Sequence, residues 1–134
     1  MVIDASALTA ILLSEPEAGH FLDVLDASEE ALVISPVSVF ETVAAIVRVT
    51  GCPFVEARAC VNAALKDYGV TITEISIEAG EEAITAFDRF GKGRHPASLN
   101  MGDCYSYALA KTLRLPILFK GDDFSRMDLE PAAA

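Results

Sequence analysis

The amino-acid sequence predicts an α/β fold, namely a three-layer α/β/α sandwich around a mostly parallel central sheet. Short apolar runs typical of buried strands alternate with pairs of longer segments that have helical spacing. The expected order is therefore β-α-α-β-α-α-β-α-α-β, and strands joined through helices pair in parallel with helices on both faces. With 134 residues the chain has the length of one ordinary domain, and we expect a single domain over 1–134.

The first three elements are expected before residue 30. The apolar run at 1–4 ends in a carboxylate and is typical of a buried strand. The segment 5–13 has leucine and isoleucine side chains on one face of a helix. A second helix is expected at 14–28, with Ser14 as its N-cap and Pro16 in its first turn.

The middle of the chain repeats this pattern. A second apolar strand is expected at 31–35, followed by helices at 36–51 and 53–69 that each end in glycine. The segment 70–76 alternates apolar and polar residues, which is typical of a strand.

The C-terminal third contains the last strand. An amphipathic helix is expected at 77–91, and a loop follows it up to residue 100. A helix at 101–114 and an apolar strand at 115–120 come next, and a turn then leads into a short final element.

The chain is acidic and rich in apolar residues. Its formal net charge is -10 and its pI is about 4.5, which argues against a nucleic-acid partner held by a basic surface. The acidity fits carboxylates gathered around a cation, or a basic protein partner. Hydrophobic residues make up 52% of the sequence, so part of the apolar surface is expected to cover a partner interface.

The sequence also indicates the compartment. No apolar run is long enough to span a bilayer, and the start of the chain lacks the basic region of a signal peptide. The cysteines have no zinc-site spacing, so we expect Cys52, Cys60 and Cys104 to be reduced and buried thiols. We therefore expect a cytoplasmic protein with no membrane partner.

Five carboxylates lie where a parallel sheet gathers its strand ends. They are Asp4 after the first strand, Glu41 in the helix after the second, Asp103 in the helix before the last strand, and Asp122 and Asp123 after that strand. Ligands of such sheets bind outside the carboxyl ends of the strands. Because Mg²⁺ and Mn²⁺ prefer oxygen ligands, the set predicts a divalent metal site suited to phosphoryl chemistry.

Most of these carboxylates also have an ordinary structural explanation. Asp103 can stabilise a helix N-terminus, and the two aspartates of the last turn can be turn residues. Asn100 is expected to be a cap or turn residue. Glu41 lies among apolar neighbours, where solvent exposure or a pair with Arg48 competes with a functional role. Asp4 adjoins a buried run, where an unpaired charge is costly, and we favour function there.

Two further features flank the carboxylates. Ser6 lies two residues after the first aspartate, where its hydroxyl can cap a helix or hold a water or a phosphate. The basic run from Arg89 to His95 contains Lys92 and Arg94, and its glycines would let the backbone approach an RNA phosphate closely. A solvated loop is the alternative for this run. Neither histidine of the chain has the spacing of a metal ligand, and both are expected to be surface residues.

Four segments together resemble the PIN-domain ribonucleases, specifically the VapC-type toxins of bacterial toxin–antitoxin pairs. They are "MVIDASAL", "SVFETVAAI", "GKGRHPASLNMGDCYSYALAK" and "LPILFKGDDF". The resemblance extends over almost the whole chain and is most specific between Gly91 and Ala110. It implies a PIN-like sandwich and a magnesium- or manganese-dependent endoribonuclease that cuts tRNA, rRNA or mRNA.

The resemblance also implies a site and partners. The family's carboxylate cluster falls on Asp4, Glu41, Asp103 and, by the family pattern G-x-D-F, Asp123. Asp122 is the alternative for the fourth acid, and Ser6 fits the serine or threonine that the family has near its first aspartate. Family members are usually homodimers, and a small basic antitoxin inhibits them by laying its C-terminal segment in a groove among the N-terminal helices.

These residues suggest a mechanism and leave one rival open. We expect Asp4, Asp103 and Asp123 to bind one or two divalent ions, directly or through water, while Glu41 binds metal or orients the attacking water. Lys92 and Arg94 are expected to position the RNA. The rival hypothesis is a non-catalytic acidic interaction module that binds a basic protein segment.

Overall fold

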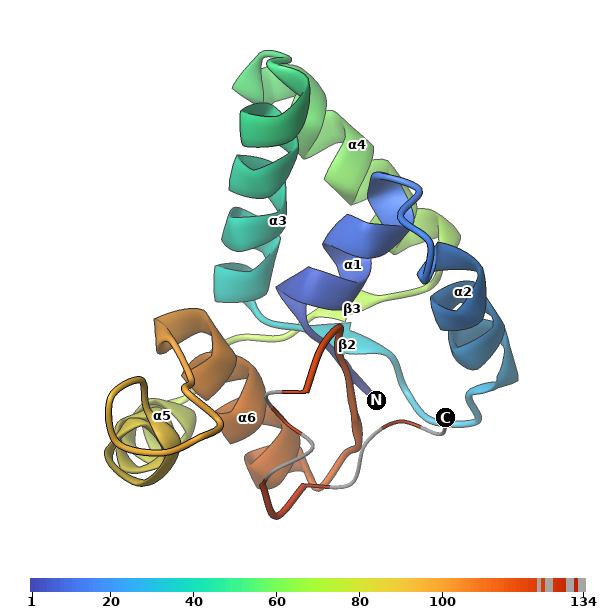
Figure 1. Cartoon of the computed structure of the whole chain (residues 1–134). Helices are drawn as coiled ribbons and strands as arrows, with labels where there is room; N and C mark the ends of the chain where they lie inside the picture. The colour runs from blue at the N-terminus through green and yellow to red at the C-terminus, as the bar shows by residue number, and fades with distance from the viewer. Residues whose placement is uncertain (123, 125–126, 130–131, 133–134) are drawn as a thin grey trace.

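A parallel sheet of four short strands forms the centre of the molecule (Figure 1). The computed structural model describes residues 1–122, 124, 127–129 and 132. Within these residues the strand order is β3-β2-β1-β4, and every pairing is parallel. The strands are β1 (Val2–Ile3), β2 (Val33–Ile34), β3 (Thr71–Ile72) and β4 (Ile117–Leu118). The predicted α/β fold with a parallel sheet is therefore confirmed.

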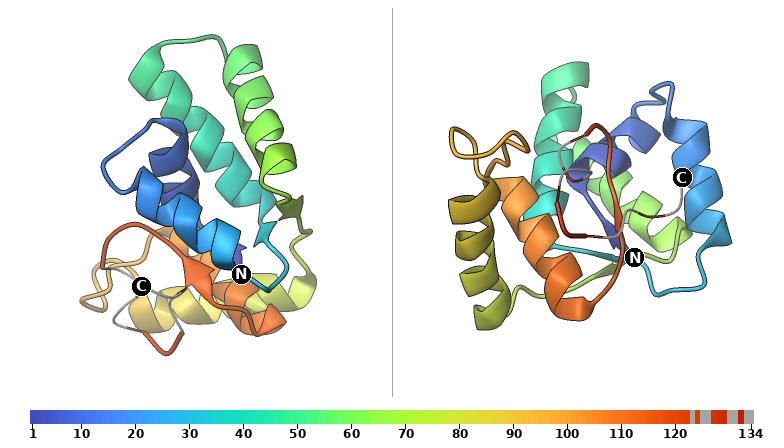
Figure 2. Two further views of the ribbon diagram at one scale, coloured as in Figure 1. Left: turned by 90° about the vertical axis from the view of Figure 1, so that its right-hand side faces the viewer. Right: turned by 60° about the horizontal axis from the view of Figure 1, so that its bottom comes forward.

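Six helices of the described residues connect the strands in the predicted order. They are α1 (Ala5–Leu12), α2 (Ala18–Ala27), α3 (Pro36–Thr50), α4 (Phe54–Asp67), α5 (Ile77–Phe90) and α6 (Met101–Leu113). Two further views show α3 lying beside α4, and α5 beside α6 (Figure 2). No helix formed by the described residues is long and apolar enough to cross a membrane.

Side chains of successive strand residues point to opposite faces of the sheet, and this alternation divides the core in two. Ile3 belongs to an apolar cluster with buried residues of α1, α2, α3 and α4. Its neighbour Val2 belongs to a second cluster with buried residues of α5 and α6. The sheet is thus the middle layer of a three-layer sandwich.

Some local predictions were wrong. Ser14 does not cap a helix, because it lies in a left-handed turn with φ 53° at the end of α1, and α2 begins only at Ala18. The strand predicted at 70–76 is reduced to two exposed residues. Cys60 is exposed rather than buried and Cys52 is partly buried, whereas Cys104 is buried as predicted; all three are free thiols. Alanine, valine and leucine side chains form the buried face of α4, so Cys60 is left on its outer face.

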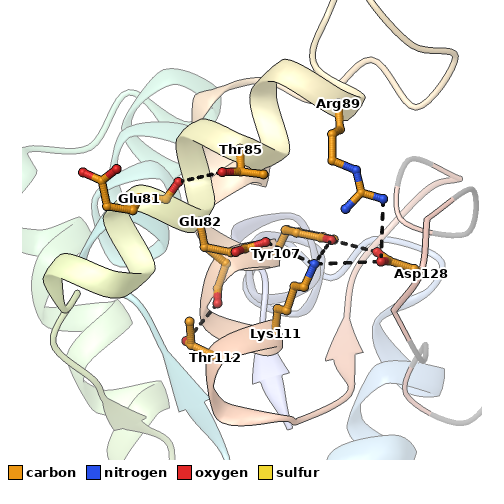
Figure 3. A network of polar contacts seen from close by, with 9 residues as sticks. Glu81, Glu82, Thr85, Arg89, Tyr107, Lys111, Thr112 and Asp128 are labelled. Carbon is orange, nitrogen blue, oxygen red and sulfur yellow. Dashed lines mark hydrogen bonds and ion pairs between the residues drawn. The ribbon is translucent and has the colours of Figure 1, made fainter.

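Described residues after β4 contact α5 and α6, and Asp128 is one of them (Figure 3). The ring of Phe124 is buried in the second apolar cluster. Further along, Asp128 accepts a hydrogen bond of 2.7 Å from the hydroxyl of Tyr107 on α6. These contacts fix the described part of the C-terminal segment against the body of the molecule.

Candidate active site

Asp4 lies at the end of β1 and caps helix α1. Only 3% of its surface is exposed. Its Oδ2 accepts hydrogen bonds from the backbone N–H of Ser6 at 2.9 Å and from the Ser6 hydroxyl at 2.6 Å. Its Oδ1 accepts a hydrogen bond from the hydroxyl of Ser106, on α6, at 2.6 Å. Three donors from two helices therefore orient this carboxylate.

A row of buried serines continues from Asp4 into the fold. The Ser106 hydroxyl lies 3.2 Å from the Ser38 hydroxyl, and Ser35 donates to Ser38 at 3.3 Å. Because the only hydroxyl proton of Ser106 goes to Asp4, Ser38 is the donor to Ser106. Neither Ser38 nor Ser106 was predicted from the sequence to be a site residue. The one available signal was that Ser106 lies one helical turn after Asp103.

Glu41 packs against the first turn of α6. Burial, together with the negative charges of Asp4 and Asp103, raises the pKa of its carboxyl to about 7. The carboxyl fits there because residue 102 is a glycine, since a Cβ at Gly102 would lie 2.1 Å from Glu41 Oε1. The contact with Gly102 argues against the alternatives of solvent exposure and of a pair with Arg48. Gly102 is a third site residue, after Ser38 and Ser106, that was not predicted from the sequence.

Asp103 forms a capping box at the start of α6. Its backbone N–H donates to Asn100 Oδ1 at 2.9 Å, and its Oδ2 accepts from the backbone N–H of Asn100 at 2.9 Å. The helix-end explanation therefore holds for Asp103 and Asn100. Asp103 is nevertheless close enough to Glu41 to contribute to the raised pKa of the Glu41 carboxyl.

The acidic turn after β4 starts beside Asp4. The backbone N–H of Lys120 donates to the hydroxyl of Ser6 at 3.0 Å, and the Lys120 ammonium pairs with Glu15 and Glu17. Asp122 lies in this turn and is exposed. Asp123, which the family pattern favours as the fourth acid, lies outside the described residues.

The basic run lies beside α5. Arg94 pairs with Asp88 of α5 at 3.1 Å, and Arg89 pairs with Asp128 at 3.9 Å. Lys92 is exposed. In the described contacts the two arginines thus pair with Asp88 and Asp128, and not with the carboxylates of the candidate site. His95 accepts a hydrogen bond from the backbone N–H of Ala97, which agrees with an ordinary structural role.

Glu41 of α3 lies near enough to Asp4, after β1, and to Asp103 of α6 for their charges to act on its carboxyl. Within the described residues no three histidine, cysteine, aspartate or glutamate side chains are grouped closely enough to hold a metal ion. The donor chemistry still fits a hard divalent cation, because such ions take oxygen ligands and complete their shell with water. Burial contributes most to the raised pKa of Glu41, and the charges of Asp4 and Asp103 add to it; a cation would relieve this added repulsion.

The family model for the PIN domain matches residues 1–130 of the chain. Three mycobacterial proteins match nearly the full length. Ribonuclease VapC42 of Mycobacterium tuberculosis is 36% identical over 133 residues and covers 98% of each chain. Ribonuclease VapC30 of the same species is 38% identical over 133 residues, with 99% of this chain and 98% of that protein covered. Ribonuclease VapC of Mycolicibacterium smegmatis is 40% identical over 129 residues, with 96% and 97% covered.

This chain belongs to the VapC family of PIN-domain proteins. Two solved structures share its fold. The crystal structure of Mycobacterium tuberculosis VapC20, described as a sarcin-ricin loop cleaving toxin, superposes with a TM-score of 0.77 at 15% identity, covering 96% of this chain and 95% of that one. A toxin–antitoxin complex from Klebsiella pneumoniae gives a TM-score of 0.70 at 18% identity, covering 95% and 92%.

Proposed function

We propose that this VapC-family chain is a metal-dependent endoribonuclease toxin that a cognate antitoxin neutralises. The observation that carries the proposal is the position of Glu41 beside Asp4 and Asp103 at one edge of a parallel sheet, where burial and these two charges raise the pKa of its carboxyl to about 7. Relatives that match the whole chain are named ribonucleases, which supports the same activity.

Asp4, Asp103 and Glu41 would hold Mg²⁺ or Mn²⁺, with Asp123 or Asp122 as the fourth acid. A bound divalent ion supplies hydroxide near neutral pH and neutralises charge on the phosphate. The chain itself supplies the orientation, since Asp4 is fixed by three hydrogen-bond donors. Glu41 lies beside the other two carboxylates, where it would bind the metal or orient the attacking water.

RNA contacts are proposed for the basic loop. Lys92 is exposed and can reach a backbone phosphate, while Arg94 must exchange its pair with Asp88 for one. The hydroxyl of Ser6 is engaged on both sides, by Asp4 and by the backbone of Lys120. These contacts favour a positioning role for Ser6 over direct RNA binding.

Exposed apolar side chains on α3 and α4 support a protein partner. Phe40, Phe54 and Val55 are 73%, 65% and 75% exposed. Apolar surface of this kind typically marks an interaction site. We propose that a basic antitoxin and a second copy of the chain cover such surfaces, in the cytoplasm, where the RNA substrate is found.

Cleavage of total RNA by the purified, antitoxin-free chain tests this function. The reaction is run with Mg²⁺, with Mn²⁺ and with EDTA, and fragments are separated by electrophoresis. We expect discrete fragments that require metal and disappear with Asp4→Asn. The matched control is Asp67→Asn, which changes an exposed aspartate at the end of α4 and is expected to leave cleavage intact.

Absence of cleavage with either metal, in a preparation shown to be free of antitoxin, would favour the rival acidic interaction module. Binding of a basic peptide by both wild type and Asp4→Asn, without any cleavage, would establish that rival.

A further inference from the structure

We propose that Ser106, held in place by Ser38, is a positioning residue that leaves Asp4 with a single lone pair for a metal ion. The inference rests on the proposed function, because it concerns the same carboxylate site. Ser106 and Ser38 lie behind Asp4, and their hydrogen bonds limit how many ions Asp4 can bind.

Most lone pairs of the Asp4 carboxylate are already occupied by hydrogen bonds. An ionised carboxylate has about four lone-pair sites, two on each oxygen. Oδ2 accepts two hydrogen bonds, both from Ser6, and Oδ1 accepts one from Ser106. Against the donors in the described residues, one site therefore remains, and it lies on Oδ1.

The two hydroxyls that occupy Asp4 are themselves fixed from behind. Ser6 donates to Oδ2 and accepts from the backbone N–H of Lys120 at 3.0 Å. Ser106 donates to Oδ1 and accepts from Ser38. Each hydroxyl proton is thus directed at the carboxylate, and neither serine can turn away without giving up a second hydrogen bond.

The Ser106 branch is completely buried. Ser38 and Ser106 are 0% exposed, and Ser35 is 1% exposed. Hydrogen bonds in series polarise one another in such surroundings, so the donation of Ser35 to Ser38 strengthens the bond that reaches Asp4. Water cannot easily replace a donor there, so removing one leaves a carboxylate oxygen without its partner.

This arrangement restricts how Asp4 can bind metal. A single free lone pair allows one bond from Oδ1 to one ion. Bidentate binding, or bridging of two ions, would require a serine to release Asp4. We therefore infer that Asp4 binds one divalent ion through one oxygen, and that Ser106 determines the direction in which that oxygen presents its free lone pair.

Mn²⁺ binding to the antitoxin-free chain tests the inference without using activity. Isothermal titration calorimetry gives the affinity and the number of ions, and electron paramagnetic resonance shows whether two ions are coupled. For wild type we expect one uncoupled Mn²⁺ at the site. Loss of an outer-shell partner typically weakens metal binding by about 10-fold to 100-fold, and we expect a loss near the lower end for Ser106→Ala.

Ser38 provides the decisive comparison. Because Ser38 acts through Ser106, we expect Ser38→Ala to weaken Mn²⁺ binding less than Ser106→Ala does. The double variant should then bind no more weakly than Ser106→Ala alone. Ser28→Ala, remote at the end of α2, is the control. Thermal unfolding of each metal-free variant separates lost stability from lost affinity, since a merely structural serine would change only the former.

The outcomes distinguish this inference from the proposed function. Unchanged Mn²⁺ affinity in Ser106→Ala, or a coupled pair of ions in wild type, would overturn the inference while leaving a metal-dependent nuclease in place. A wild-type chain that binds no Mn²⁺ would overturn both the metal dependence and the inference.

Discussion

The position of Glu41 depends on the absence of a side chain at Gly102. Its carboxyl occupies the space where any Cβ at residue 102 would be, at the first turn of α6. This places a half-buried carboxyl beside Asp4 and Asp103, and burial together with these two negative charges raises the cost of ionising Glu41. Two consequences of this contact can be measured.

Gly102→Ala should separate activity from stability. The new methyl group meets the far end of a flexible side chain, so Glu41 can move away at little cost to the fold. Alanine also favours a helix over glycine by about 1 kcal/mol. We expect an unfolding temperature that is unchanged or higher, with RNA cleavage at least about 10-fold slower because a displaced catalytic group loses its geometry.

Gly80→Ala is the matched control for this variant. Gly80 lies inside α5, and a Cβ there meets nothing within 4 Å. It should gain the same helical preference and retain full activity. Wild-type cleavage rates in Gly102→Ala would show that the position of Glu41 does not matter.

The stability of the metal-free chain should depend on the protonation of Glu41. Folding raises the pKa of this carboxyl from 4.5 to about 7, so the folded state binds the proton more tightly. This contribution is complete below pH 4.5 and is lost as the pH rises towards 7. Between pH 4.5 and 7 the free energy of unfolding, measured by urea denaturation in EDTA, should decrease less steeply with pH in Glu41→Gln than in wild type. An identical pH profile for Glu41→Gln and wild type would contradict the shift.

At the scale of the element, the start of α6 combines two roles. The capping box between Asn100 and Asp103 satisfies backbone N–H groups that no helix can pair internally. It also fixes the backbone that carries Asp103 towards Glu41. Helix stability and site geometry are therefore coupled in this one turn.

Asn100→Ala should lower both stability and activity. Loss of an N-cap costs about 1 kcal/mol, and here it also loosens the turn that carries Asp103. Ser76→Ala removes the equivalent cap of α5, whose hydroxyl accepts from the N–H of Ala79 at 3.0 Å. We expect a similar loss in urea denaturation for both variants, but a loss of RNA cleavage at saturating metal only for Asn100→Ala. Equal cleavage by the two would contradict the coupling.

The elements were predictable where the signal is local. Apolar periodicity gave the order of strands and helices, and carboxylates directly after strands marked the edge where Asp4 lies. Gly102 and Ser106 were not predictable, because their roles depend on partners far away in the sequence. Ser106 and Asp4 are 102 residues apart, and a glycine in a helix carries no sign of the side chain it admits. The role of Asp123 remains a prediction.

At the scale of the whole molecule, a polar network joins α5, α6 and the C-terminal segment (Figure 3). Lys111 donates to the Tyr107 hydroxyl at 3.1 Å and pairs with Glu82 of α5 at 3.1 Å. The hydroxyl of Tyr107 in turn donates to Asp128. The Asp128 Oδ2 also lies 3.9 Å from the Arg89 Nη2. The network holds the segment that follows the acidic turn.

Tyr107→Phe should release this segment without disturbing the core. Its ring is fully buried and remains, while Asp128 loses its closest donor. Because Asp128 is about half exposed, water replaces part of the bond, and we expect a loss of about 1 kcal/mol. Hydrogen exchange should accelerate at 127–129 and not in β1. Tyr105→Phe, on the same helix, is the control, and unchanged exchange at 127–129 would show that the network does not hold the segment.

The strand order has a consequence for how the protein is made. The first strand, β1, lies inside the sheet, with the last strand, β4, as one of its two neighbours. The backbone N–H of Asp4 is bonded to the carbonyl of Leu118, and its carboxylate is bonded to Ser106. A chain still being synthesised contains Asp4 long before it contains these partners, which lie more than 100 residues further along. The carboxylate site therefore cannot assemble until both α6 and β4 have been synthesised.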